Sequence, residues 1–156
     1  MFFQSNFGIV TKAGVWLQPE PEMTAKIELA FPKFEDAAWA IDILADLRRR
    51  DVIQHNIVFG NPVRAASVVS QRAEWHEGPG AIPDKACEAM IAKLGIGWWN
   101  AKINLFGHAA TVKAHVELIR GLFEPRLGRE LNFEFWQQGD PTDQRAASRR
   151  RLACRA

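Results

Sequence analysis

The sequence predicts an α+β domain in which helices cover one face of a mixed or antiparallel sheet. Segments with the alternation or β-branched content of strands are interleaved with segments whose apolar residues recur at helical spacing. The expected strands are 24–31, 98–106 and 131–136, and the expected helices are 34–50, 83–94 and 109–123. Two strand–helix units and a closing strand give the fold a ferredoxin-like character.

The first unit begins with residues 24–31, where polar and apolar side chains alternate as in a half-buried strand that Pro32 ends. The helix over 34–50 has acidic residues in its first turn and arginines in its last, an order that suits the helix dipole. We interpret Arg48-Arg49-Arg50 as a solvated helix end, with a phosphate or partner site as the alternative. The apolar face of this helix is expected to comprise Ala37, Ile41, Leu44 and Leu47.

The middle of the chain is less regular. Val52-Ile53 and Ile57-Val58-Phe59 have extended character, and Gly60-Asn61-Pro62 breaks the chain after them. Residues 63–70 form either a short helix or a further strand, because periodicity cannot separate the two over so few residues. Gly78-Pro79-Gly80 predicts a loop before the next helix.

The second half repeats the pattern of the first. Pro83 suits the first turn of the helix over 83–94, and Gly95 fits just past its end. The apolar face of that helix should hold Cys87, Met90, Ile91 and Leu94. The helix over 109–123 should bury a stripe made of Val112, Val116, Ile119 and Phe123.

Composition is ordinary for a soluble globular domain: 156 residues, 47% apolar and 24% charged. No window approaches the roughly 18 uninterrupted apolar residues of a membrane span, and no secretory leader is evident, so a cytoplasmic location is expected. Cys87 and Cys154 are too few to predict a disulfide framework. We expect Cys87 to behave as a small buried apolar residue.

The net charge of +2 comes from the C-terminal tail. Residues 139–156 hold five arginines and two aspartates, which gives +3 and leaves about −1 for the other 138 residues. The body therefore lacks the basic stripe that nucleic-acid binding needs, and no nucleic-acid partner is expected. With almost no large apolar residues, this tail is expected to be disordered, and we interpret it as an altered ending of the chain.

The N-terminal run is the most informative motif. Gln4-Ser5-Asn6-Phe7-Gly8-Ile9-Val10-Thr11-Lys12 is followed by Trp16-Leu17-Gln18-Pro19-Glu20-Pro21. Gly8 permits a tight turn, and the β-branched residues after it suit a strand that the prolines end. These residues predict a glycine turn leading into a buried strand, separated from the remainder of its domain.

Both parts of this run resemble the vanillyl-alcohol oxidase and 4-cresol dehydrogenase family of flavoenzymes, which includes eugenol oxidases and hydroxylases. A second stretch, Leu94–Asn100 continuing through Leu105-Phe106-Gly107, is similar to a passage of that family's cap domain. Phe106 stands where relatives often carry tyrosine. The resemblance extends from about Phe2 to about Gln138.

The resemblance implies that residues 1–18 are the end of an FAD-binding domain and that residues 19–138 are part of the cap domain over the flavin. In that family the glycine turn lies against FAD, so the implied cofactor-binding residues are Ser5, Asn6, Gly8, Ile9 and Val10. The family's pyrophosphate loop, flavin attachment residue and phenol-binding tyrosines have no matching segments in this chain. No catalytic residue is therefore assigned.

Other candidates have structural interpretations as well. The four histidines show no metal-ligand spacing with an acidic or cysteine partner, so no metal site is expected. Trp98, Trp99 and Asn100 either face a pocket for an aromatic substrate or pack within the fold. Arg64 is a candidate partner for a buried carboxylate or a subunit contact.

The function implied by the resemblance is oxidation of para-substituted phenols, with hydride leaving the benzylic carbon for flavin N5. The expected partners are a phenolic small molecule in the intact enzyme and a second copy of the chain, with no membrane partner. Because most of the cofactor cradle has no counterpart, we expect the isolated chain to be inactive. The alternative is a stand-alone α+β module for binding or oligomerisation that kept the cap fold.

Overall fold

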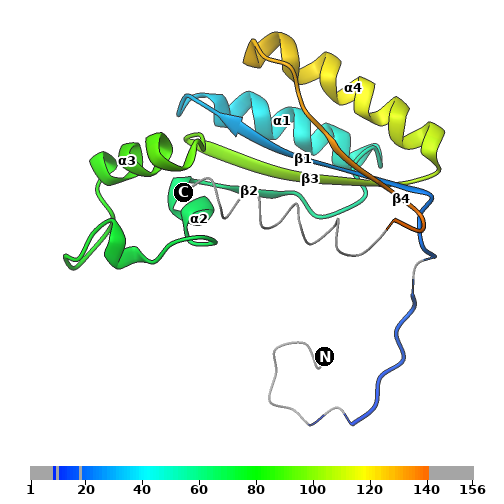
Figure 1. The fold of residues 1–156 in the computed structure, drawn as a ribbon, viewed down its shortest axis with the longest axis horizontal. Coiled ribbons are helices and arrows are strands. Elements are labelled where there is room, and N and C mark those ends of the chain that lie inside the picture. The colour runs from blue at the N-terminus through cyan, green and yellow to red at the C-terminus, as the bar shows by residue number, and fades with distance from the viewer. Residues whose placement is uncertain (1–8, 10, 18, 141–156) are drawn as a thin grey trace.

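The computed structural model describes residues 9, 11–17 and 19–140. It places helices over a sheet in the order expected from the sequence (Figure 1). The strands are β1 (Met23–Phe31), β2 (Val58–Gly60), β3 (Trp99–Gly107) and β4 (Glu134–Gln137). The helices are α1 (Asp36–Arg49), α2 (Pro62–Ala66), α3 (Asp84–Leu94) and α4 (Ala109–Leu127), with a 3-10 turn at Arg72–Glu74.

The sheet order is β2-β3-β1-β4, and all three strand pairings are antiparallel. Of the two arrangements that the sequence left open, the antiparallel one is therefore present. β1 and β3 pair along their whole length, from Met23 opposite Gly107 to Phe31 opposite Trp99. With α1 and α4 on the same face of the sheet (Figure 1), this is the split βαβ arrangement of ferredoxin-like folds, so the predicted fold class is confirmed.

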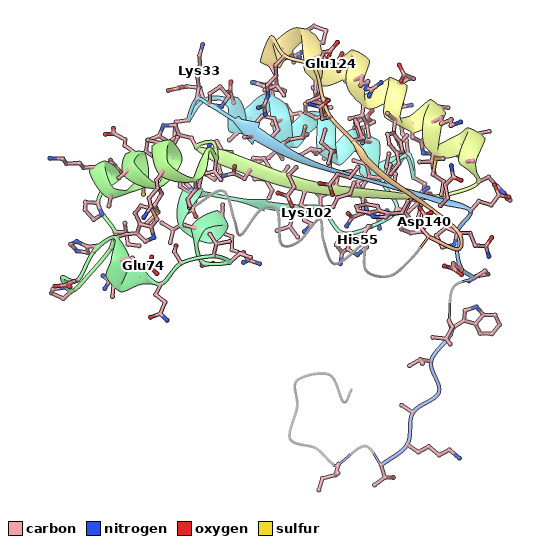
Figure 2. The ribbon with its side chains drawn as sticks, viewed as in Figure 1. Lys33, His55, Glu74, Lys102, Glu124 and Asp140 are labelled. Carbon is pink, nitrogen blue, oxygen red and sulfur yellow. The ribbon has the colours of Figure 1, made fainter. Side chains whose placement is uncertain are left out.

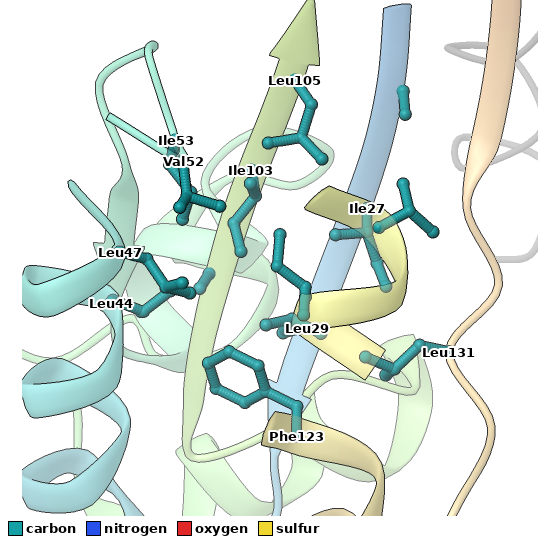
Figure 3. Close-up of a cluster of buried hydrophobic side chains, with 14 of the residues drawn as sticks. Ile27, Leu29, Leu44, Leu47, Val52, Ile53, Ile103, Leu105, Phe123 and Leu131 are labelled. Atoms are coloured by element: carbon teal, nitrogen blue, oxygen red, sulfur yellow. The ribbon is translucent and has the colours of Figure 1, made fainter. Parts of the chain in front are cut away.

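The core lies between that sheet face and the two long helices. Alternate residues of β1 and β3 point into it, because successive strand side chains alternate between faces. Phe123 of α4 and Leu44 of α1 pack against them, and Leu131 lies at one side of the cluster (Figure 3). The inward strand residues are Ala25, Ile27, Leu29, Phe31, Ala101, Ile103 and Leu105.

The predicted apolar face of α1 is wrong in one respect. Ala40, Leu44 and Leu47 are its buried residues, whereas Ile41 is 48% exposed and Ala37 is only half-buried. Both sets have helical spacing, so periodicity alone could not choose between them. The helix turns its small residue, Ala40, toward the sheet and leaves the larger isoleucine on its flank.

The end of α1 explains why Val52 and Ile53 are not a strand. Asp51 adopts a left-handed conformation with φ 54°, and Val52 N donates to Leu47 O at 3.0 Å. Asp51 N also donates to Arg48 O, which completes a Schellman motif. Val52 and Ile53 are buried in the core by this turn. The arginines of the last turn pair with Asp46 and Asp51, as expected of a solvated helix end.

Three further boundaries differ from expectation or resolve it. Residues 63–70 contain the short helix α2, for which the Asn61 side chain accepts a hydrogen bond from Arg64 N at 2.9 Å. Helix α4 continues past residue 123 to Leu127 and ends at Gly128, which has φ 64°. The closing strand begins at Glu134 rather than at the expected residue 131. Leu131 packs into the core instead, and its N–H donates to the Glu124 side chain.

The buried strand predicted after Gly8 is not present at Ile9 and Thr11, the two of its residues that the structure describes. Ile9 is 92% exposed, and neither Ile9 nor Thr11 belongs to a strand, while Val10 and Gly8 lie outside the described residues. No strand of the described part lies beside them to supply hydrogen bonds or burial. The tail beyond residue 140 is likewise outside the description. None of the described helices is both long and apolar enough to span a bilayer.

Candidate functional site

The connection between α3 and β3 contains the second family-like motif, and its two glycines have separate structural roles. Gly95 ends α3 in a left-handed conformation with φ 65°, and its N–H donates to Ile91 O at 3.0 Å. Gly97 crosses close to the backbone of Phe31 at the end of β1. A Cβ at Gly97 would lie 2.6 Å from Phe31 N, so this crossing requires glycine.

Asn100 closes the turn that Gly97 begins. Its side-chain oxygen accepts from Gly97 N and its side-chain nitrogen donates to Gly97 O, both at 2.9 Å. Both halves of the amide are therefore used within the turn. Of the two interpretations of Asn100, packing within the fold is the one that the structure supports.

Trp98 and Trp99 follow from this turn into an aromatic cluster. Trp99 donates from Nε1 to Phe34 O at 2.7 Å and stacks on Phe59, with ring centroids 5.5 Å apart and planes 17° apart. Phe34 contacts Trp98 edge-on at 6.4 Å. Both tryptophans are half-buried and border a cavity, so packing and pocket lining occur together.

The cavity, here called the aromatic cleft, has a volume of about 610 Å³. It is bounded by the aromatic cluster, by α2 and by the N-terminal end of α3. Its lining residues are Phe34, Asn61, Pro62, Val63, Arg64, Ser67, Ala81, Ile82, Asp84, Cys87, Trp98 and Trp99. Sequence reasoning named Arg64 and the tryptophans but missed Phe34, Ile82 and Asp84, because the lining comes from four separate segments of the chain.

Polar contacts hold the loop that connects the 3-10 turn at Arg72–Glu74 to α3. Arg72 donates from its guanidinium to Gly78 O at 2.7 Å and to Gly80 O at 2.8 Å. Trp75 Nε1 donates to Ser70 Oγ at 2.8 Å, and Lys93 Nζ lies 5.2 Å above the Trp75 ring. The loop is thus fixed against α3 although it buries few apolar side chains.

Among the residues that the structure describes, two charged side chains line the cleft, Arg64 and Asp84, and they do not form an ion pair with each other. Within the described part of the chain, the side chains of Arg64 and Asp84 have neither a hydrogen bond nor an ion pair. Cys87 is buried at the cleft's inner wall, as predicted. Burial raises the pKa of its thiol, and the nearby carboxylates of Asp84 and Glu88 raise it further, so the thiol stays protonated at neutral pH.

The sheet face opposite α1 and α4 carries a row of charged side chains. The Lys26 Nζ atom lies 3.1 Å from Glu28 Oε1 and 3.9 Å from Glu134 Oε2. The Lys102 Nζ atom lies 3.5 Å from the same Glu28 oxygen. Figure 2 shows Lys102 on this side, away from α1 and α4. Lys26 is 8% exposed and is the one charged residue among the buried residues of the described part.

A second polar contact joins the start of β1 to the start of α4. Glu22 accepts from Ala109 N at 3.0 Å, and its other oxygen lies 3.0 Å from His108 Nδ1. The hydrogen bond to His108, followed by that from Ala109, lowers the pKa of the Glu22 carboxyl. Sequence reasoning missed this pair because its members are 86 residues apart.

The proposed cofactor-binding residues are not assembled into a site by the described part of the chain. Ser5, Asn6, Gly8 and Val10 lie outside the described residues, and Ile9 is exposed. Groups of acidic, histidine and cysteine residues that could hold a metal ion are not found among residues 9, 11–17 and 19–140.

Comparison with known proteins gives matches over part of their length. No family model matches the chain. Over 130 residues the chain is 32% identical to the flavoprotein subunit of 4-cresol dehydrogenase (hydroxylating) from Pseudomonas putida, which covers 83% of this chain and 25% of that protein. Over 101 residues it is 30% identical to 1'-carboxy-chondrochloren decarboxylase from Chondromyces crocatus, which covers 65% of this chain and 18% of that protein.

Solved structures agree with these matches. A structure of p-cresol methylhydroxylase with substrate bound superimposes with a TM-score of 0.66 and 28% identity, over 84% of this chain and 26% of that one. A structure of 4-ethylphenol oxidase from Gulosibacter chungangensis, in complex with isoeugenol, superimposes with a TM-score of 0.64 and 25% sequence identity. The match covers 86% of this chain and 27% of that one. The resemblance to the 4-cresol dehydrogenase group is confirmed, and the chain spans about a quarter of the length of these relatives.

Proposed function

We propose that this chain is one part of an FAD-dependent oxidoreductase that oxidises para-substituted phenols. The observation that carries the proposal is the 32% identity to a 4-cresol dehydrogenase flavoprotein subunit over 130 residues. Superposition on p-cresol methylhydroxylase over nearly the same share of the chain supports it. A phenolic small molecule would be the substrate of the complete enzyme, and a cytoplasmic location stays a prediction.

Within that enzyme, residues 1–18 would end the FAD-binding domain, residues 19–138 would form part of the cap domain, and residues 139–156 would be a basic tail. The described N-terminal segment supports this division. Val15, Trp16 and Leu17 are exposed, with Trp16 at 100%, and consecutive exposed apolar residues are typical of a surface that another part covers. Figure 1 shows the segment leaving β1 on the side opposite α1 and α4.

The described residues do not by themselves fit a flavin. FAD carries a pyrophosphate, and among the described residues that line the aromatic cleft the one cation is Arg64. Of the five proposed flavin contacts only Ile9 is described, and its side chain is exposed. A flavin would therefore be held chiefly by other parts of the enzyme. We expect the isolated chain neither to bind FAD nor to turn over 4-hydroxybenzyl alcohol.

A chimera tests this proposal. The matching segment of the Pseudomonas putida flavoprotein subunit is replaced by residues 19–138, and flavin content and 4-cresol oxidation are measured. We expect the chimera to retain flavin and measurable oxidation, whereas the same chimera with Leu29→Asp in the buried core should lose both. A folded chimera that keeps its flavin but oxidises no phenol would contradict the proposal.

A stand-alone module for binding or oligomerisation is the second candidate. The observation that favours it is the ferredoxin-like arrangement of β1 to β4, which has a hydrophobic core of its own. Size-exclusion chromatography of the isolated chain separates the two candidates. A well-defined dimer without flavin would favour the module, and aggregation through exposed apolar residues would favour the part of a larger enzyme.

A further inference from the structure

We propose that the aromatic cleft binds a small aromatic carboxylate. The proposal concerns the described residues alone and does not depend on the flavin chemistry proposed above. It rests on three properties of the cleft: its size, its aromatic wall and an arginine whose side chain has no partner among the described residues.

The aromatic cleft is an open groove whose volume and lining can accommodate a small molecule. Such sites have volumes of about 300–1,000 Å³ and apolar walls with a few polar groups, and the cleft has about 610 Å³. Pro62, Val63 and Ile82 supply aliphatic wall. Trp98 makes one ring contact in the described structure, edge-on to Phe34, so it retains ring surface for a ligand.

Arg64 supplies the site for the carboxylate. Every other arginine of the described part has a side-chain partner: an ion pair, a carbonyl oxygen or an aromatic ring. The guanidinium of Arg64 has none, although it borders the cleft. A planar guanidinium binds a carboxylate through two parallel hydrogen bonds, and no other side chain matches that geometry as well.

The local structure positions this arginine. Its backbone N–H is held by the Asn61 side chain at 2.9 Å, and its carbonyl accepts from Ser67 Oγ at 2.9 Å. Its stem lies against Gly60, where an added Cβ would come within 2.8 Å of Arg64 Cγ. The side-chain oxygen of Asn61 and the hydroxyl of Ser67 are therefore used in holding α2, and the guanidinium remains for a ligand.

Asp84 limits the charge of that ligand. Its carboxylate also borders the cleft and has no partner in the described part of the chain. A second negative charge on the ligand would be repelled by it, so the cleft favours a monocarboxylate over a dianion such as a phosphate. Asp84 therefore adds selectivity, and its removal should strengthen the binding of any anion.

The test is a titration of the full chain with benzoate and with neutral benzamide, followed by the amide and indole N–H signals of Trp98 and Trp99 in NMR spectra. We expect benzoate to bind with a Kd on the order of 1 mM, as for a ligand of this size, and benzamide to bind at least about tenfold more weakly. Arg64→Gln, which keeps the stem against Gly60, should abolish that difference.

Two further variants make the result specific. Asp84→Asn should strengthen benzoate binding about two- to threefold, because it removes a like charge. Arg49→Gln, at the exposed end of α1, is the matched control and should leave the benzoate Kd unchanged. Benzamide binding equal to benzoate, stronger binding of benzylamine, or an unchanged Kd in a folded Arg64→Gln variant would each overturn the proposal. If that variant does not fold, the benzoate–benzamide comparison and Asp84→Asn decide the matter.

Discussion

Replacing Gly97 by alanine should destabilise the domain, because the added methyl group has no room. The new Cβ would lie 2.6 Å from Phe31 N and 2.8 Å from Phe31 C, and it would also contact Phe31 O. Since non-bonded carbon atoms pack at about 3.5 Å or more, the loop must retreat from β1 by roughly 1 Å. Glycine's conformational freedom is not at issue here, since close approach alone excludes the methyl group.

The size of the effect follows from two contributions. Overpacking at such a contact costs about 1–3 kcal/mol. Retreat of the loop also weakens the two Asn100–Gly97 hydrogen bonds, each worth about 1 kcal/mol. We therefore expect Gly97→Ala to lower the free energy of unfolding by about 3 kcal/mol and the Tm by about 10 °C.

Gly121→Ala is the matched control. Gly121 lies within α4, is exposed, and has no atom within 4 Å of where a Cβ would stand. Alanine should therefore raise the free energy of unfolding there by about 0.5–1 kcal/mol, through its better helix propensity. Urea unfolding followed by circular dichroism measures both variants. A Gly97→Ala variant within about 0.5 kcal/mol of the wild type would refute the steric reasoning, because that is the range of neutral surface substitutions.

The remaining predictions concern three other contacts. Glu22→Gln should remove a pH-dependent part of the free energy of unfolding, because the hydrogen bond to His108 lowers the pKa of the Glu22 carboxyl in the folded state. The extra stability of the wild type over the variant is then full above pH 4.5 and is lost as the pH falls through the lowered pKa. Urea midpoints at several pH values check this, and an advantage that grows on acidification would contradict it. Leu29→Ala should cost about 2–5 kcal/mol in urea unfolding, since Leu29 is 1% exposed between strands and helices; a cost below about 1 kcal/mol would be inconsistent with that burial. Arg72→Met should speed amide hydrogen exchange in residues 75–82 and leave the exchange of β1 unchanged, because the arginine bonds to two carbonyl oxygens of that loop. Equal loop exchange in the wild type and the variant would show that Arg72 does not hold the loop.

Local features were predicted most accurately from the sequence. The β1 alternation and the ends of α3 at Pro83 and Gly95 were confirmed within a residue or two. The stripe of α4 from Val112 to Phe123 was also confirmed. These features depend on side chains within one or two turns of each other, so a short window of sequence contains their cause.

The candidate site was predicted only in part. The tryptophans and Arg64 stood out by type and neighbourhood, but Phe34 and Asp84 did not. Trp99 reaches Phe34 across 65 positions, and no spacing rule connects residues so far apart. The prediction that Ile41 lies on the buried face of α1 failed for a related reason. The face that is buried, with Ala40 on it, is selected by a sheet built from distant strands.

The sequence by itself determined the three long helices and the strands β1, β3 and β4 to within a few residues, and it indicated the flavoenzyme resemblance, since propensity, periodicity and motifs are carried by neighbouring residues. Only the tertiary structure decided the strand order, the charged row on the sheet face opposite α1 and α4, and the aromatic cleft. Each of these depends on contacts between segments far apart in the chain, such as Glu28 of β1 with Lys102 of β3. Their energies come from burial and distance, which exist only after the chain has folded.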